Sequence, residues 1–219
     1  MKRIATLLSV CLIAVSFAAA QATLPGIKYT QNTDDEDDEY EEGNTDFNYG
    51  MTLSGDQYIR IALGANFPLN FPDFGSVIDG SSKLKIGGAG TLGYHSFISE
   101  KVAIGVDLGF GFNLTVGSHS FNTVPILFTT TFEPSFKRFS FPLSLGAGIA
   151  WESYNGKNYF PGLALKPQGG VHFRITESWT AGLETAYLFL PQFNALYESG
   201  ARNRFGHFWT IDLVARYMF

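Results

Sequence analysis

The chain has 219 residues, of which 24 are Gly, 21 Phe and 10 Tyr, while only 16% are charged and the formal net charge is −5. Gly weakens helix interiors and aromatic residues favour strands, so this composition excludes a helical bundle and a coiled coil. A negative net charge repels phosphate and excludes a nucleic-acid partner. The composition therefore predicts an all-β protein.

Residues 1–22 have the features of a cleaved secretory signal peptide. Lys2 and Arg3 precede an apolar stretch over 4–17, which small residues up to Ala22 follow. This stretch is too short for a membrane-spanning helix, which needs about 20 apolar residues. The single cysteine, Cys11, lies inside it, so the mature chain would contain no disulfide. Lipid attachment at Cys11 is the alternative, and the bulky Val10 before it argues against that.

Residues 23–46 carry a dense negative charge. Eight acidic residues occupy the nine positions 34–42. Such a run repels itself and has no apolar area to bury, which predicts a disordered acidic leader. A weak cation-binding or partner-docking tail is the alternative. No coordination geometry is encoded, so we predict no metal site there.

Residues 47–219 form the predicted folded domain, in which apolar and polar residues alternate with a period of two. In the clearest run, 102–116, every even position holds Val, Ile, Leu or Phe, and the odd positions hold small or polar residues. The alternation predicts eight strands, long enough to cross a bilayer at a tilt. They are 57–67, 83–95, 102–116, 122–133, 139–154, 163–175, 179–190 and 205–219. Alternation over 47–53 leaves open an earlier start of the first strand, near Met51.

Charged residues decide between a soluble sheet and a membrane barrel. Within these segments each one shares the face opposite the apolar residues of its own strand. Lipid explains this exclusion, because Arg or Lys on the lipid face of a barrel costs about 2–4 kcal/mol at the midplane. The predicted lumen-facing charge network comprises Arg60, Lys83, Lys85, Asp107, Glu133, Glu152, Lys166, His172, Arg174, Glu184, Asp212 and Arg216. Compensating ion pairs and a selectivity filter are the two interpretations, and we expect Asp107, Glu152, Glu184 and Asp212 to pair with Arg60, Lys85, Arg174 or Arg216.

Closure follows because every amide must be paired in hydrocarbon, and an even strand number returns both termini to the periplasmic side. We therefore predict an eight-stranded antiparallel up-and-down transmembrane β-barrel in the bacterial outer membrane, with short periplasmic turns and longer outer loops. The outer loops would be 68–82, 117–121, 155–162 and 191–204, and the turns 96–101, 134–138 and 176–178. Aromatic residues near the strand ends would lie in the lipid headgroup layers.

Two stretches resemble known outer-membrane proteins. Residues 214–219 end in Tyr217-Met218-Phe219, which resembles the carboxy-terminal signal that the barrel-assembly machinery reads. Val124-Pro125-Ile126, followed by the Gly-x-Gly strand over 141–151, is similar to the central strands of small OmpW-like barrels. This resemblance implies passive entry of small, often hydrophobic, molecules through a narrow barrel with a side opening.

Eight strands leave an interior barely wide enough for side chains, which argues against an aqueous porin. Interior glycines such as Gly93 and Gly105 would either leave space or permit tight strand coiling. Pro125 and Pro167 lack a ladder donor and are the candidate wall opening. We therefore predict passive passage of small solutes, hydrophobic ones among them. The alternative is a structural or adhesive barrel whose outer loops bind partners without transport.

Signatures of catalysis are missing from the sequence. It has no Gly-x-Ser-x-Gly elbow and no His-Glu-x-x-His, and its four histidines follow no metal-ligand spacing. We predict no enzyme, no cofactor and no metal. The expected partners are outer-membrane lipid, the barrel-assembly machinery and small hydrophobic solutes.

Overall fold

The computed structural model describes residues 52–71, 75–76, 83–116, 119–154, 157–196 and 201–219. The signal peptide and the acidic leader predicted for 1–46 lie outside these residues, as does the alternative strand start near Met51. Every regular element in the described part is a β-strand. No helix there is long and apolar enough to cross a membrane.

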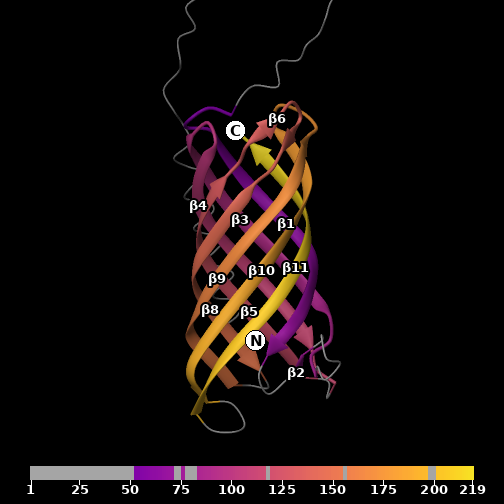
Figure 1. The fold of residues 1–219 in the computed structure, drawn as a ribbon, viewed down its shortest axis with the longest axis vertical. Helices are drawn as coiled ribbons and strands as arrows, with labels where there is room; N and C mark the ends of the chain where they lie inside the picture. The colour runs from indigo at the N-terminus through magenta and orange to yellow at the C-terminus, as the bar shows by residue number, and fades with distance from the viewer. Residues whose placement is uncertain (1–51, 72–74, 77–82, 117–118, 155–156, 197–200) are drawn as a thin grey trace, which may run out of the picture. The chain divides into compact units, whose positions relative to one another are not determined.

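Eight long strands form one closed wall. They are β1 (Gln57–Phe71), β3 (Gly87–Ser99), β4 (Val102–Leu114), β5 (Ser120–Phe132), β8 (Leu143–Tyr154), β9 (Lys157–Arg174), β10 (Trp179–Leu196) and β11 (Ala201–Met218). Each pairs antiparallel with the next, and β11 pairs back onto β1 from Tyr58↔Met218 onward. Figure 1 shows these strands tilted around a common axis. The predicted eight-stranded antiparallel up-and-down barrel is confirmed.

Three short strands pair at the ends of the long strands. β2 (Gly75–Ser76) pairs with the outer end of β1. β6 (Ser135–Phe136) and β7 (Phe139–Ser140) form a hairpin between β5 and β8, and β7 also pairs with β9. This hairpin lies at the same end of the barrel as the chain's carboxyl terminus (Figure 1).

Several strand ends differ from the predicted ones. β9 begins at Lys157, β10 continues to Leu196, and β11 begins at Ala201. Much of the predicted outer loops 155–162 and 191–204 is therefore strand. Antiparallel hydrogen bonds require no apolar face, so pairing continues beyond the alternating pattern. β3 begins at Gly87 instead of residue 83, and β8 begins at Leu143 instead of residue 139.

The two faces of the wall have opposite polarity. Leu63, Leu183 and Leu213 point outward and are 65%, 55% and 69% exposed. By contrast, Arg60 and Asp107 are each only 1% exposed, because alternate residues point into the lumen. An apolar exterior around a charged interior is the arrangement expected of a barrel surrounded by lipid.

Aromatic rings gather near both ends of the barrel. At the periplasmic end Trp179 packs on Tyr217 with ring centroids 5.1 Å apart. Towards the outer end Phe67 packs on Trp209 at 5.5 Å. Such rings favour the lipid headgroup layers, so the two groups mark the limits of the hydrocarbon-facing zone.

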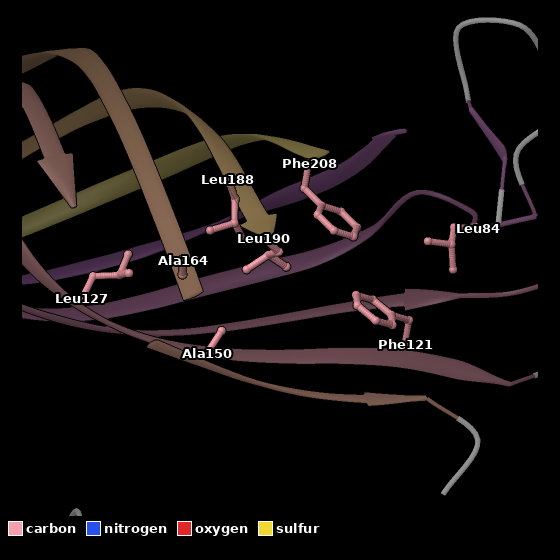
Figure 2. Close-up of a cluster of buried hydrophobic side chains, with 8 residues drawn as sticks. All are labelled: Leu84, Phe121, Leu127, Ala150, Ala164, Leu188, Leu190 and Phe208. Carbon is pink, nitrogen blue, oxygen red and sulfur yellow. The ribbon is translucent and has the colours of Figure 1, made fainter. Parts of the chain in front are cut away.

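Packed side chains fill the lumen at both ends. Figure 2 shows the outer apolar cluster, in which the rings of Phe121 and Phe208 approach each other from opposite strands. The rings are stacked at 5.7 Å. A smaller inner cluster near the periplasmic end comprises Tyr58, Phe97 and Ala103. The outer apolar cluster consists of Leu84, Phe121, Leu127, Ala150, Ala164, Leu188, Leu190 and Phe208.

Candidate functional site in the barrel lumen

A layer of buried charges separates the two apolar clusters, and Arg60 on β1 lies at its centre. Its Nη1 is 3.3 Å from Asp107 Oδ1 on β4. Its Nη2 contacts Glu184 Oε2 on β10 and donates to Gln168 Oε1 on β9 at 3.4 Å. One guanidinium therefore contacts side chains of three other strands. Its charge balances two carboxylates that are buried inside the barrel, away from water.

Arg216 on β11 extends this layer towards the periplasm. Its Nη2 lies 3.3 Å from Glu184 Oε1, and its Nη1 donates to Glu133 Oε2 at 2.6 Å. Its guanidinium also lies 4.8 Å from the centroid of the Tyr58 ring, within cation–π range. Burial would raise the pKa of Glu133, which lies beyond the end of β5, but Arg216 holds that pKa below its ordinary value.

Two histidines complete the layer. His95 Nε2 lies 3.1 Å from Asp107 Oδ1, and His172 Nε2 lies 2.9 Å from Glu184 Oε1. The His95 ring also stacks on Tyr58, with centroids 4.9 Å apart. Thr129 Oγ1 donates to Asp107 Oδ2 at 2.8 Å. Both oxygens of Asp107 thereby have polar partners, so buried side chains from several strands pack against one another at this height of the lumen.

The interior glycines make room for this layer. A Cβ on Gly93 would lie 2.1 Å from Asp107 Oδ1 and 2.8 Å from His95 Nε2. On Gly105 it would lie 2.5 Å from the His95 ring. The sequence left two interpretations of the interior glycines, open space in the lumen or tight coiling of the strands. At Gly93 and Gly105 neither is sufficient, because neighbouring groups occupy the volume that a side chain would fill.

Lys83 and Lys85 do not join the network, so their predicted lumen-facing placement is wrong. Both are exposed, whereas Leu84 between them is 2% exposed and bridges to Thr115. The alternation therefore changes phase before β3 begins at Gly87. Any register irregularity of this kind moves each preceding side chain to the other face of the sheet.

The other predicted members lie in the wall facing inward, but not all find the expected partners. Lys166 is 7% exposed and donates to Thr91 Oγ1 at 3.3 Å, and Arg174 donates to Thr52 Oγ1 at 3.3 Å. Asp212 accepts a hydrogen bond from Thr210. Glu152 accepts one from Gln192 Nε2. Among the described residues neither Asp212 nor Glu152 forms an ion pair with a basic side chain, contrary to expectation.

The two prolines lie at interruptions of the strand ladder. Between β4 and β5 the register passes from Leu108↔Ile126 to Gly111↔Thr123, leaving a gap opposite Pro125. Between β9 and β10 it stops at Ala186↔Gln168 and resumes for the single pair Phe189↔Leu165, leaving a gap opposite Pro167. Pro125 is buried and points inward, whereas Pro167 is exposed on the lipid side.

Only the second gap opens into a longer separation. Beyond Phe189↔Leu165, no ladder pair joins the described residues of β9 and β10, although both strands continue outward. Each strand there pairs with its other neighbour, β8 or β11. We call this stretch, 157–164 of β9 and 190–196 of β10, the β9–β10 seam.

A tyrosine hydroxyl spans the β9–β10 seam. Phe193 N donates to Tyr159 Oη at 2.9 Å, and Tyr159 Oη donates to Phe193 O at 3.1 Å. Ala164 and Leu190, which flank the seam on the inside, belong to the outer apolar cluster. Outside, Leu163 is 51% exposed and Phe193 is 53% exposed. Apolar residues thus lie on both sides of the wall at the seam.

Sequence reasoning missed the residues that shape this region, namely Tyr159, Gln192, Phe193, Phe121 and Phe208. Tyr159, Phe193 and Phe121 fall in the predicted outer loops 155–162, 191–204 and 117–121, where an aromatic residue carries no positional signal. Phe208 differs from its strand neighbours only in parity. Inward parity of a large aromatic residue was the available signal for a filled outer lumen.

A shallow apolar groove lies on the outside of the wall. Its volume is about 660 Å³, and the residues that line it include Ala181, Gly182, Ala215, Leu63, Phe173 and Leu213. This surface faces the hydrocarbon, where lipid chains fill such depressions. Among the described residues no three His, Cys, Asp or Glu side chains are grouped as metal ligands.

The closed wall, the apolar exterior and the charged lumen define a small bacterial outer-membrane β-barrel protein. A protein-family model matches residues 34–217. An uncharacterized protein of Treponema pallidum is 31% identical over 181 residues, which cover 78% of this chain and 80% of that protein. The chain therefore belongs to the same family as this Treponema pallidum protein.

The same fold is found in a solved structure. Neisserial surface protein A is similar with a TM-score of 0.58 and 14% identity, over 76% of this chain and 98% of that one. The outer membrane protein OprG of Pseudomonas aeruginosa is similar with a TM-score of 0.48 and 11% identity, over 76% of this chain and 97% of that one.

Proposed function

We propose that the protein lets small hydrophobic solutes pass from outside the cell into the outer membrane through the outer half of the barrel and the β9–β10 seam. The observation that carries this proposal is the seam, where no ladder pair joins the described residues of the two wall strands and the Tyr159 hydroxyl bridges them. The outer apolar cluster lines the inner side of the seam, and the exposed side chains of Leu163 and Phe193 lie on its outer side.

The filled inner half of the lumen supports this sideways route over a path along the axis. A solute moving to the periplasm would have to cross Arg60, Asp107 and Glu184, which are 1%, 1% and 4% exposed and joined by ion pairs. Separating buried partners leaves an uncompensated charge and costs about 3–5 kcal/mol. An apolar solute offers those charges no replacement contact, so the route ends above this layer.

Removal of the Tyr159 hydroxyl tests the proposal. In liposomes held in the gel phase, where spontaneous entry of dyes is slow, uptake of N-phenylnaphthylamine is followed by its fluorescence increase. We expect Tyr159→Phe to raise protein-dependent uptake about 5-fold, since the seam loses two hydrogen bonds. Tyr94→Phe is the matched control, because its hydroxyl donates to Gln57 Oε1 at the periplasmic end.

A barrel that only supports surface loops is the second candidate function, and the packing of both lumen clusters favours it. Under this alternative, uptake by wild-type liposomes equals that of empty liposomes and Tyr159→Phe changes nothing. That result would reject passage. Binding of a partner that survives grafting of the outer loops onto another barrel would then support the adhesive role.

Export and insertion are part of the same proposal. We infer that residues 1–22 are removed after export and that Tyr217 and Phe219 present the carboxy-terminal strand to the barrel-assembly machinery. Phe219 is 55% exposed, and its N donates to Gln57 O at 3.0 Å. Its ring is therefore accessible on the outside of the closing strand pair.

A further inference from the structure

Glu152 is a buried carboxylate with no counter-ion among the side chains that the structure describes. It lies on β8 opposite Tyr159 of β9 and is 0% exposed. Gln192 Nε2 donates to its Oε2, whereas its Oε1 has no hydrogen-bond partner. No Lys, Arg or His forms an ion pair with it among the residues whose side chains are described, a set that leaves out 194–204. By contrast, Asp107 and Glu184, the buried acids in the layer of charges around Arg60, each form an ion pair with Arg60.

Such a group requires something else to balance it. An isolated carboxylate in an apolar environment is strongly disfavoured, so it takes up a proton or binds a cation. Glu152 has the outer apolar cluster beside it, since Ala150 precedes it on β8 and Leu190 precedes Gln192 on β10. The position combines one acceptor oxygen with an apolar wall.

The open side of the carboxylate faces Gly162 on β9. A Cβ at Gly162 would lie 2.7 Å from Glu152 Oε1 and 3.2 Å from the Tyr159 ring. Any larger residue would therefore crowd this buried oxygen, and glycine leaves room beside it at the β9–β10 seam. Tyr159, whose hydroxyl spans the seam, is the ladder partner of Glu152 on β9.

The depth of the site matches an amphipathic ligand. The neighbouring Trp151 points outward and is 36% exposed, close to the aromatic rings that mark the outer headgroup layer. A molecule with a charged head and an apolar body orients with its head at that layer. Its body would then lie deeper, beside Ala150 and Leu127, the members of the outer apolar cluster that lie inward of Glu152 along β8 and β5.

We propose that Glu152 binds the ammonium group of small organic cations whose apolar part packs against the outer apolar cluster. This inference rests on the proposed function, because it names the class of solute that the β9–β10 seam admits. Gln192 holds Oε2 and directs Oε1 towards the seam. The ammonium donates to Oε1, and the charge of the ligand replaces the missing basic side chain.

The test compares two ligands of equal chain length, hexylammonium and 1-hexanol. Full-length mature protein in lipid nanodiscs is titrated calorimetrically, and binding to empty nanodiscs is subtracted. We expect wild type to bind hexylammonium about 10-fold more tightly than hexanol, the effect of one charge-assisted hydrogen bond. Glu152→Gln should abolish this preference and keep the hexanol affinity.

Glu177→Gln is the matched control, since it removes the same charge from an exposed turn at the periplasmic end. It should keep the preference for hexylammonium. Folding of each variant is checked by the heat-dependent shift in gel mobility that folded barrels show. Should Glu152→Gln not fold, Gly162→Ala provides the second test, because its methyl group crowds Oε1 and should reduce hexylammonium binding alone.

Two results would overturn the inference. Equal affinity of wild type for both ligands would mean that Glu152 carries a proton and binds no cation. A preference that survives both Glu152→Gln and Gly162→Ala would place the cation elsewhere. Failure of the proposed passage is recognised separately, because dye uptake that does not depend on the protein leaves this equilibrium binding measurement intact.

Discussion

Arg60 is the side chain on which the buried charges of the lumen most depend. It forms ion pairs with Asp107 and Glu184, and all three are at most 4% exposed. A buried pair contributes little over an apolar pair of the same shape, but loss of one partner strands the other in a medium that cannot solvate it. Arg60 therefore affects stability chiefly because its removal would leave Asp107 and Glu184 buried without a counter-charge.

Replacement of Arg60 by Met should destabilise the barrel by about 3–5 kcal/mol, since two carboxylates lose their guanidinium at once. Arg60→Lys should lose less, because it keeps the charge but not the fork that reaches both acids. Urea titration of the refolded protein in lipid vesicles measures the free energy of unfolding. Lys85→Met, an exposed residue, is the control and should change it by less than about 0.5 kcal/mol.

At this scale the sequence predicts which way a residue points better than what it contacts. Parity alone placed Arg60, Asp107 and Glu184 in the lumen, because a strand turns alternate residues to the same side. It failed for Lys83 and Lys85, where the alternation changes phase near the strand's beginning. It also could not reveal that Glu152 meets Gln192, since contacts across the lumen depend on the stagger of strands distant in sequence.

At the scale of strands, the two prolines have different consequences although both remove a ladder donor. Beside Pro125 the ladder resumes at once on either side of the gap. Beside Pro167 one pair follows and the strands then separate. The sequence predicted both as weak points, but the extent of the β9–β10 seam depends on strand ends that its pattern does not define.

Pro167→Val should strengthen the wall beside the seam, because it restores a backbone donor opposite Tyr187. One added hydrogen bond contributes about 0.5–1.5 kcal/mol, so we expect amide exchange in 187–196 to slow about 2- to 10-fold. Hydrogen–deuterium exchange with mass spectrometry in nanodiscs measures this. Pro125→Val is the matched substitution and should leave exchange in 187–196 as in wild type, whereas slowing by both would assign the effect to general stiffening.

At the scale of the whole molecule, apolar and charged side chains are separated between the outside and the inside of the barrel. Outside, exposed leucines and aromatic rings contact lipid, and inside, the charges compensate one another or meet polar neighbours. This separation was the property that the sequence predicted best, because the bilayer penalises each charged residue on the lipid-facing side independently of the others. Where the bilayer ends, the penalty falls away, and there the predicted strand ends and loops were least accurate.

The same separation predicts that an outward charge is tolerated according to its depth. Leu213 and Val116 are almost equally exposed, at 69% and 68%, but Leu213 lies on β11 among hydrocarbon-facing residues and Val116 follows the outer end of β4. Leu213→Arg should cost about 2–4 kcal/mol and Val116→Arg about 0–1 kcal/mol in vesicle unfolding titrations. Equal costs for the two substitutions would contradict the placement of the membrane on this barrel, since their exposed fractions alone do not distinguish them.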